Sequence, residues 1–503
     1  MAREGIDRRS WIFIGVAIAI GVVNALLAAF LLFPKPYVAS WGEEIDRHEE
    51  YLYLRDVTFT QDDLEAIASI KTLKYLSLQN CNVGECRLPE LRFASKGIYH
   101  LELIDVGGLW DSSFLSDLPV EYLSLEGCTR FDDLSVLNLE ELSERDVSGT
   151  SVTDLSPLAG SDIRRLKFAR TKVSDLAPLA KMPSLRDVDG SDTEVTSLDA
   201  LKNLSSYSSL AFAGCAIEEV PEGLEYLYAL DLSRTKISDF SSLGNIRPVQ
   251  LDLAGNPQLD DISWLGDDAR EYLRHLNLAG TGLEKNDLTL VPRLSKLEEL
   301  YLDGIALGDL NMFGDLRELR YLSAVGCDLS DVSGVKNLPQ IETLLLGYNH
   351  IEDLKGLPKP NADWPRLLLD LSHNGLTSLK GLPGGDYRLL LLQGNDIDYA
   401  KALNPMVSSY MVVVSWNDSI DGSALSQYDR FSRTYVLDYP ESRGDEPADG
   451  FSPYQFAATT PDQLLYAIKN DAFDYTLYED MEWYVRYAEA QGDGVADNGG
   501  PFE

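Results

Sequence analysis

The sequence predicts an α/β solenoid, a stack of coils with short parallel strands on one side and 3₁₀ turns or irregular segments on the other. One pattern of apolar residues recurs along most of the chain and is clearest in residues 145–241. A threonine or cysteine marks one position of this pattern at spacings of 21, 22, 22 and 20 residues: Thr150, Thr171, Thr193, Cys215 and Thr235. A period near 22 indicates units that bury their apolar faces only by stacking on their neighbours.

Each unit begins with an apolar, polar, apolar triplet, such as Leu230, Asp231 and Leu232. Successive side chains of a strand point to opposite faces, so the triplet predicts a short strand with both leucines inside and the middle residue outside. The middle residues of successive triplets are therefore predicted to line one exposed strand face.

The position three residues after each strand predicts an internal hydrogen-bond ladder. The chain turns away there, and a short Asn, Thr or Cys side chain can bond to the turn of the adjacent coil. The predicted ladder residues are Thr150, Thr171, Thr193, Cys215, Thr235, Asn256, Asn349, Asn374, Asn395 and Asn417. Counted from Val57, this position gives seventeen coils, and residues 435–437 are a candidate eighteenth.

The segment after the ladder position predicts about one turn of helix on the side opposite the strands. Ser156 suits an N-cap and Pro157 the first helical position, and the remaining residues leave no room for a longer helix. Coils of 24–25 residues predict longer segments on this side, and they occur around Cys81, Thr281, Ile305 and Asn374.

The recurring pattern LxLxxNxIxDLxPL resembles a leucine-rich repeat of the short bacterial, internalin-like type. Repeated matches carry the resemblance, which covers roughly residues 50–440, and we assign the repeats to residues 51–440. It implies a horseshoe with parallel strands on a concave face, short 3₁₀ or irregular segments on the convex face, and a partner bound on the concave side. The sequence lacks a C-terminal LPxTG-type sorting motif, so the resemblance does not extend to attachment at a cell wall.

Residues 11–33 predict a transmembrane helix that acts as a signal anchor. These 23 residues carry no charge, and at about 1.5 Å per residue they span a hydrocarbon core of about 30 Å. Three arginines in residues 1–10 place the N-terminus in the cytoplasm and the repeats at the cell surface. Cleavage at a weak small-residue site in residues 38–40 is the alternative. Residues 34–50 are predicted to form a spacer and N-terminal cap.

The repeat pattern ends near residue 440. Residues 441–490 are predicted to be a polar linker followed by helices, with Thr460 as N-cap and Pro461 as the first helical residue. These helices either cover the open end of the solenoid as a C-terminal cap or form a small partner-binding module. Residues 491–503 are predicted to be a disordered acidic tail.

Composition and motifs exclude several classes of function. The chain has 81 acidic and 43 basic residues, a net charge of −38, which disfavours nucleic acid as a partner. This charge suits a soluble extracellular surface or a basic partner, and it could equally serve solubility alone. The five histidines and five cysteines lack metal-ligand spacing, and no catalytic motif is present. We therefore predict no cofactor, no metal and no enzyme activity.

Cysteine positions follow the repeat. Four of the five cysteines fall at ladder positions, where small buried side chains with weak donors are expected. Cys81 and Cys86 are near enough in sequence to form a local disulfide in an oxidising compartment, and the sequence leaves this pairing open.

The predicted partner-binding surface consists of the middle residues of the strand triplets. Small and acidic side chains dominate its centre, and apolar ones appear toward its C-terminal end, which the C-terminal helices could also cover. The candidate binding residues are Asp189, Asp231, Asp252, Asn277, Tyr301, Leu345, Asp370, Leu391 and Val413. The first hypothesis is a non-catalytic, membrane-anchored scaffold that binds a protein or surface polymer through its concave face. The second is a component of a membrane signalling or assembly complex whose C-terminal helical region contacts the partner.

Overall fold

The computed structural model describes residues 37–397, except 85, 89–92, 96, 110–111, 203–207, 226 and 361–366, together with two strands at 407–413 and 435–437. The predicted transmembrane segment 11–33, the ladder residue Asn417, the C-terminal helices and the acidic tail lie outside these residues. No helix in the described part of the chain has the length and apolar character that crossing a membrane requires. The chain forms two compact units, unit 1 up to Ser205 and unit 2 from Ser206.

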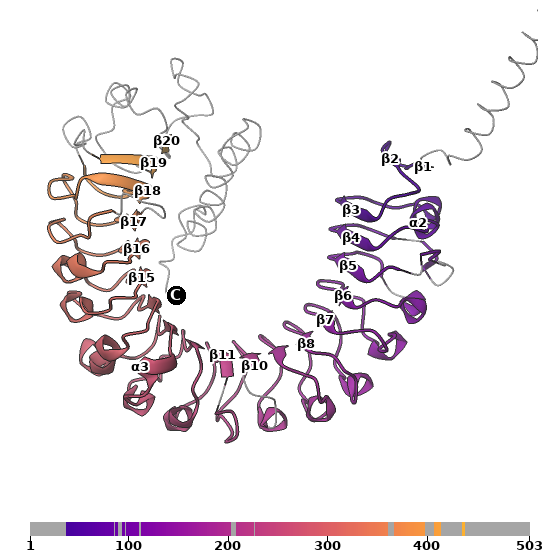
Figure 1. The fold of residues 1–503 in the computed structure, drawn as a ribbon, viewed down its shortest axis with the longest axis horizontal. Coiled ribbons are helices and arrows are strands. Elements are labelled where there is room, and N and C mark those ends of the chain that lie inside the picture. Colours follow the sequence, from indigo (N-terminus) through magenta and orange to yellow (C-terminus); the bar gives the residue numbers. More distant parts are fainter. Residues whose placement is uncertain are drawn as a thin grey trace, which may run out of the picture. The chain divides into compact units, whose positions relative to one another are not determined.

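Unit 1 contains a ladder of parallel strands, each paired with the next in sequence. The strands are β3 (Tyr51–Arg55), β4 (Tyr75–Gln79), β5 (His100–Ile104), β6 (Tyr122–Ser124), β7 (Glu144–Asp146), β8 (Arg165–Lys167) and β9 (Asp187–Asp189). The opposite side carries helix α2 (Gln61–Ala68) and the 3₁₀ turns η2 (Ser113–Asp117), η3 (Leu134–Val136), η4 (Ser156–Leu158), η5 (Leu179–Lys181) and η6 (Asp199–Leu201). Figure 1 shows the strands of this unit on the inner side of its curve.

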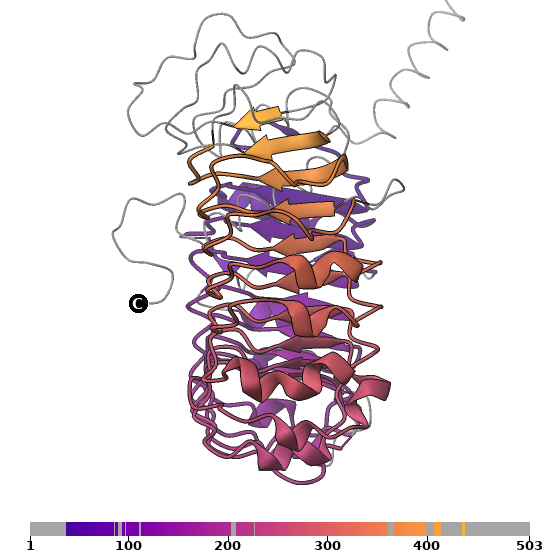
Figure 2. The ribbon, with the colours of Figure 1, turned by 90° about the vertical axis from the view of Figure 1, so that its left-hand side faces the viewer.

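Unit 2 repeats the arrangement with more coils. Its parallel strands are β10 (Ser208–Ala211), β11 (Leu227–Asp231), β12 (Gln250–Asp252), β13 (His275–Asn277), β14 (Glu299–Tyr301), β15 (Tyr321–Ser323), β16 (Thr343–Leu345), β17 (Leu367–Asp370), β18 (Gly385–Leu391), β19 (Val407–Val413) and β20 (Tyr435–Leu437), and Figure 2 shows them stacked. The opposite side carries η7 (Ser241–Asn245), η8 (Ser263–Leu265), α3 (Ala269–Tyr272), η9 (Lys285–Arg293), η10 (Asn311–Phe313) and η11 (Ser333–Asn337). The solenoid predicted from the periodicity is confirmed within each unit.

Coil length decides what lies opposite each strand. The 24-residue coil that ends at Cys81 contains helix α2, the 25-residue coil that ends at Thr281 contains α3, and the next coil contains the nine-residue turn η9. Coils of the basic length hold only short 3₁₀ turns, because two or three fewer residues remain after the strand. The longer segments predicted for these three coils are therefore present. The one predicted for the coil that ends at Asn374 falls partly on residues 361–366, outside the described residues.

The short 3₁₀ turns begin differently from the prediction. Ser156 is the first residue of η4 rather than its N-cap, and the Oδ1 atom of Asp154 accepts a hydrogen bond from the Ser156 N–H at 2.7 Å. Seven further coils use an aspartate in the same way, with N···O distances of 2.8–2.9 Å. The eight turn-closing aspartates are Asp133, Asp154, Asp175, Asp239, Asp261, Asp309, Asp331 and Asp353. Each satisfies a backbone N–H that the turn itself leaves without a partner.

The residue before the ladder position adopts a left-handed conformation in all sixteen coils whose ladder position lies between residues 57 and 395. Its φ angle lies between +48° and +78°, and eight of the sixteen residues are glycine. Glycine adopts this conformation without steric cost, and Asn and Asp tolerate it better than other residues. In unit 2 the His373 imidazole lies against Gly394, and the Cβ of any larger residue there would collide with that ring.

The ladder residues form two kinds of hydrogen bond. Asn349 bridges coils, because its Nδ2 donates to the Ala324 carbonyl at 2.9 Å and its Oδ1 accepts from the Cys327 N–H at 2.8 Å. Asn256, Asn374 and Asn395 make equivalent bonds to the preceding coil.

The threonines bond mainly within their own coils, although the Thr235 hydroxyl also reaches the amide oxygen of Asn256 in the next coil at 3.1 Å. Thr150 donates to the carbonyl of Val147 at 2.6 Å, and Thr171 and Thr193 repeat this bond three residues back. A hydroxyl lies one bond from Cβ and reaches the near carbonyl, whereas the longer amide also reaches the preceding coil. Cys128 and Cys327 do cross, to the carbonyls of Leu103 and Leu302.

A hairpin and one buried carboxylate build the N-terminal cap. Strands β1 (Tyr37–Val38) and β2 (Glu44–Ile45) pair antiparallel, and Asp63 in helix α2 is fully buried beside them. Its carboxylate accepts hydrogen bonds from the Tyr37 hydroxyl, from the N–H and hydroxyl of Ser40, and from the N–H and hydroxyl of Thr60, at 2.6–2.9 Å. Asp63 therefore caps α2 and fastens the hairpin to the first coil.

Candidate partner-binding strand face

The strand face carries two columns of outward side chains, of which the triplet pattern predicted only one. The second column holds the middle residues of the triplets, and the first column holds the residues two positions earlier. In unit 1 the first column is Tyr51, Tyr75, His100, Tyr122, Glu144, Arg165 and Asp187, and the second is Tyr53, Ser77, Glu102, Ser124, Asp146, Lys167 and Asp189. The alternation in YLSL and HLEL was the signal that could have revealed the first column.

Aromatic rings gather on strands β3 to β6. The ring centroids lie 4.7 Å apart for Tyr53 and Tyr75, 4.2 Å for Tyr75 and His100, and 4.0 Å for His100 and Tyr122. Tyr51 and Tyr99 flank this stack, each with its ring centroid 6.5 Å from a stacked ring. We name these six residues the aromatic patch. Parallel strands bring the same position of every coil into register, so aromatic residues at one position stack.

One carboxylate lies within the aromatic patch. Glu102 is half-buried, and its Oε1 lies 2.9 Å from Nε2 of His100. Burial by itself raises the pKa of Glu102, but hydrogen bonds from His100, Ser77 and Tyr75 outweigh it and hold the pKa below its ordinary value. Burial, and then this carboxylate, raise the pKa of Tyr75 and of Tyr122. The patch thus carries negative potential and neutral phenols.

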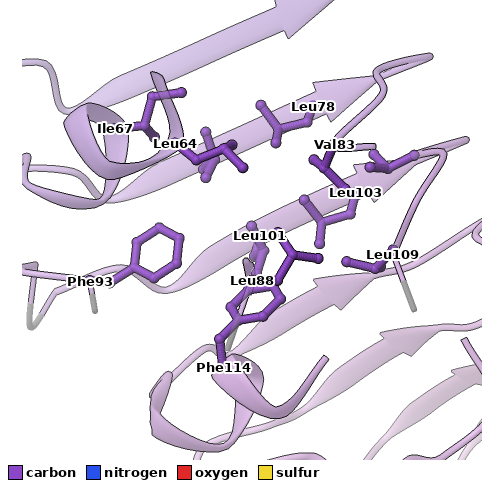
Figure 3. A pocket seen from close by; sticks show the side chains of 12 residues that line it. Leu64, Ile67, Leu78, Val83, Leu88, Phe93, Leu101, Leu103, Leu109 and Phe114 are labelled. Carbon is purple, nitrogen blue, oxygen red and sulfur yellow. The ribbon is translucent and has the colours of Figure 1, made fainter. Parts of the chain in front are cut away.

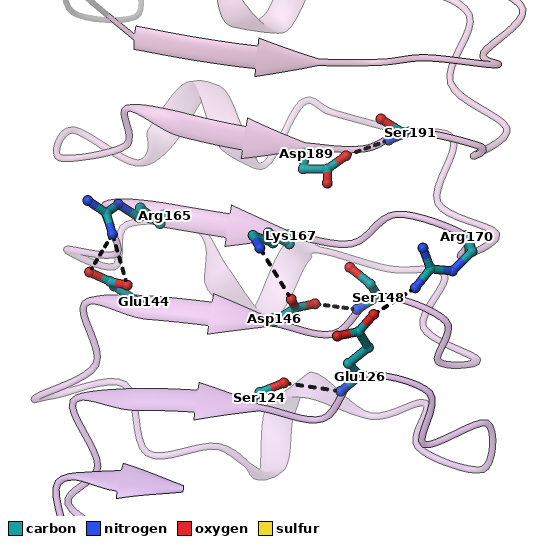
Figure 4. A network of polar contacts seen from close by, with 10 residues as sticks. All are labelled: Ser124, Glu126, Glu144, Asp146, Ser148, Arg165, Lys167, Arg170, Asp189 and Ser191. Atoms are coloured by element: carbon teal, nitrogen blue, oxygen red, sulfur yellow. Dashed lines mark hydrogen bonds and ion pairs between the residues drawn. The ribbon is translucent and has the colours of Figure 1, made fainter. Parts of the chain in front are cut away.

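Ion pairs replace aromatic rings further along unit 1 (Figure 4). Arg165 in the first column bonds to Glu144 on one side and to Asp187 on the other, at 3.2 and 3.1 Å. Lys167 in the second column lies 3.8 Å from Asp146. These side chains are paired with each other across neighbouring strands, and the exposed pairs of Arg165 contribute little to stability.

In unit 2 the second column is acidic at its centre. Asp231, Asp252, Asn277 and Tyr301 follow one another on β11 to β14, and all four are partly exposed. Burial and the neighbouring Asp231 raise the pKa of Asp252, although a 2.8 Å hydrogen bond from Asn277 opposes this. These residues, with Asp189 in unit 1, are the predicted binding residues that the structure leaves accessible.

The second-column aspartates also have a structural role. Asp146, Asp189, Asp231, Asp252 and Asp370 each accept the N–H of the residue two positions on through Oδ1, at 2.8–3.1 Å. Asn277 makes the same bond with its amide oxygen, to the N–H of Ala279 at 3.1 Å. The turn therefore needs the oxygen atom rather than the charge.

Three predicted binding residues near the C-terminal end require correction. Leu345 is 2% exposed, and Asp370 and Leu391 are 0% exposed, so they do not offer an open contact surface. Their positions on strands β16 to β18 are in register with the exposed second column. Sequence periodicity predicts the direction in which a side chain points, but not whether other residues cover it. Val413 lies on β19, where the structure describes only the backbone.

The cavities and cysteines supply no reactive centre among the described residues. A cavity of about 30 Å³ under β4 and β5 is lined only by apolar side chains (Figure 3), far below the roughly 300 Å³ of small-molecule pockets. An open depression of about 370 Å³ in unit 2 is bordered by His350, Glu352 and His373, but no group of three side chains in the described part of the chain is placed to hold a metal. Cys81 and Cys86 are buried free thiols, and the disulfide left open by the sequence is not formed.

No protein-family model and no curated protein matches the sequence. Solved structures of similar architecture include the internalin InlF of Listeria monocytogenes, at 20% identity and a TM-score of 0.39, covering 77% of this chain and 90% of that one. The leucine-rich repeat protein LIC12759 of Leptospira interrogans is 16% identical with a TM-score of 0.43, covering 68% and 91%. The functional domain of InlJ from L. monocytogenes is 18% identical with a TM-score of 0.39, covering 74% and 76%. At these values the likenesses say nothing about a partner.

Proposed function

We propose that this protein is a non-catalytic, membrane-anchored scaffold that binds a protein or surface polymer on its strand face. The observation that carries the proposal is the pair of outward columns, which present partly exposed tyrosine and carboxylate side chains at a fixed spacing. Aromatic and charged side chains on a rigid, open surface suit recognition of a partner. The net charge of −38 favours a basic one.

The proposal also includes the location of the protein. Residues 11–33 anchor the chain in the membrane, residues 1–10 remain in the cytoplasm, and the repeats face outward. This rests on the uncharged length of residues 11–33 and on the three arginines before them.

A capture experiment with matched variants tests the proposal. The protein used to capture the partner is a fragment that starts at residue 34. Tyr37 and Ser40 are kept because they bond to Asp63, and removing them would open the N-terminal cap. Asp189→Asn with Asp231→Asn removes two charges from the strand face and keeps the turn bonds, as Asn277 shows. Asp154→Asn with Asp175→Asn makes the same chemical change on the opposite side.

The expected result is that the strand-face variant loses its partner and the control variant retains it. Retention by both variants, with loss on truncation after residue 440, would overturn the proposal. That outcome would support a membrane signalling or assembly complex in which the C-terminal helical region makes the contact.

A further inference from the structure

The aromatic patch of unit 1 exposes more ring surface than the repeat requires. Tyr51, Tyr53 and Tyr99 are 50%, 62% and 42% exposed, and they are three of the five large apolar or aromatic side chains that stand out as exposed among the described residues. Coils elsewhere in unit 1 place Glu144, Arg165 or Asp187 in the first column. The repeat therefore tolerates charged residues here, and the rings are not needed to build it.

The stack leaves some ring faces open and covers others. Tyr75, His100 and Tyr122 lie nearly parallel, at interplanar angles of 17° and 11°, so His100 is covered by a ring on both faces and Tyr75 and Tyr122 each turn one face to it. Tyr51 and Tyr53 lie on β3, the first strand of the ladder, and among the described residues their ring contacts are with Tyr75 on β4. Their outer faces extend the stack toward solvent.

Charge around these rings has one dominant sign. Glu102 lies under the stack with His100 as its hydrogen-bond partner, and the charges of Glu102, Asp146, Glu144 and Glu126 all act on the Tyr122 hydroxyl. Two basic residues lie near the rings, and both are paired: Lys74 with Glu50 at 2.7 Å, and Arg55, two positions after Tyr53 on the same face of β3, with Asp56 at 3.7 Å. A ring face beside carboxylates attracts a cation and repels an anion.

We propose that the aromatic patch is a docking site for arginine side chains of a partner protein, a proposal that rests on the proposed function and specifies its partner. A planar guanidinium can stack on the open faces of Tyr51 and Tyr53 while its N–H groups donate to tyrosine hydroxyls. Glu102, two strands away on β5, attracts the cation without contacting it. Lysine carries the same charge but lacks the plane and the fork of donors, and it holds its water more strongly. The patch therefore prefers arginine to lysine.

The probe is a synthetic peptide of alternating glycine and arginine, titrated calorimetrically into the full-length protein in detergent. Matched peptides replace arginine by lysine, by the neutral isostere citrulline, or by proline. The arginine peptide is expected to bind several-fold more tightly than the lysine peptide, and the citrulline and proline peptides are expected not to bind. If the citrulline or proline peptide bound as tightly as the arginine peptide, the proposal would be overturned, because the surface would then recognise shape rather than charge.

Variants locate the site. Tyr51→Ser with Tyr53→Ser alters only exposed rings. This variant should weaken binding of the arginine peptide by about 5- to 30-fold, which is the scale of two cation–π contacts. Glu102→Gln removes a charge that acts from two strands away and should weaken binding of the arginine peptide by about 2-fold. Tyr228→Ser is the control, since Tyr228 is 46% exposed on β11 in unit 2, and it should have no effect.

Unchanged binding in the Tyr51 and Tyr53 variant would overturn the patch as the site. The proposed function is judged separately, by capture of the partner with the Asp189 and Asp231 variant. Failure of the two proposals is thus distinguishable.

Discussion

His100 and Glu102 lie two residues apart on strand β5 and face the same side, with Nε2 of the histidine 2.9 Å from Oε1 of the glutamate. Period-two alternation makes this contact possible, and the rings of Tyr75 and Tyr122 hold the imidazole in place from both sides. The pair connects the two outward columns of unit 1 and places the carboxylate of Glu102 next to the aromatic stack.

Glu102 should make the stability of unit 1 sensitive to acid. Its pKa is below the ordinary value in the folded state, so its stabilising contribution is complete above the unfolded pKa of about 4.3 and is lost as the pH falls through the folded value. Glu102→Gln should reduce the difference in urea midpoint between pH 7 and pH 3. Tyrosine fluorescence reports on the stack directly, and an unchanged difference would contradict this assignment.

Arg145 should be a destabilising residue. It occupies an inward leucine position on β7, in register with Leu123 and Leu166, is 2% exposed, and none of its three guanidinium nitrogens has a hydrogen-bond partner. Burial lowers its pKa to about 9. Arg145→Leu should therefore raise the free energy of unfolding by about 2 kcal/mol or more.

Thermal and urea unfolding would measure this gain. Arg165→Leu on the adjacent strand is the comparison, because Arg165 is exposed and ion-paired, and it should give no gain. A loss of stability in Arg145→Leu would show that the guanidinium has a partner in solution.

Asp63→Ala should open the N-terminal cap. It removes the acceptor of five hydrogen bonds from Tyr37, Ser40 and Thr60, and the expected loss is about 2–4 kcal/mol. Burial by itself raises the pKa of Asp63, but hydrogen bonds from Ser40 and Thr60 outweigh it and hold this pKa well below its usual range. The stability that Asp63 contributes is therefore also lost toward low pH. Amide hydrogen exchange in residues 37–68 should rise first, and uniform exchange over unit 1 would argue against a local cap.

The two kinds of ladder residue should differ in cost when truncated. Asn349→Ala removes bonds to two coils and leaves the buried N–H groups of Cys327 and Leu329 without acceptors, at an expected cost of about 3 kcal/mol or more. Thr150→Ala removes one bond within its own coil and should cost about 1 kcal/mol. Equal losses in urea unfolding would mean that coil-to-coil bonding adds nothing.

Periodicity predicted the parts of this fold that repeat. Strand positions, the buried column that includes Asn256 and Asn395, and the coils that hold α2, α3 and η9 all follow from spacing, since each coil must return the chain to the same register. The left-handed residue of the sixteen coils described was not predicted, because Arg170, Tyr348 and His373 occupy this position as well as glycine.

The binding surface was predicted only in part. Asp231 and Asn277 face outward as expected, but Leu345 and Asp370 are buried at equivalent positions, because local alternation determines which way a residue faces and not what covers it. The aromatic patch was not predicted, because the triplet pattern defines only the residue between the two leucines, and most of the rings lie two positions before it. Arg145 was missed as a core residue because a guanidinium in that position contradicts the pattern.

The turn-closing aspartates link the length of this protein to its behaviour as a polyanion. Eight of them, with the five aspartates of the second column, make thirteen carboxylates that are acceptors for the chain's own backbone. A chain that grows by duplicating coils therefore gains negative charge with each added coil, independently of any ligand that it binds. Mutual repulsion between copies then rises with the number of coils, so a longer array keeps its many strands from associating with those of its neighbours.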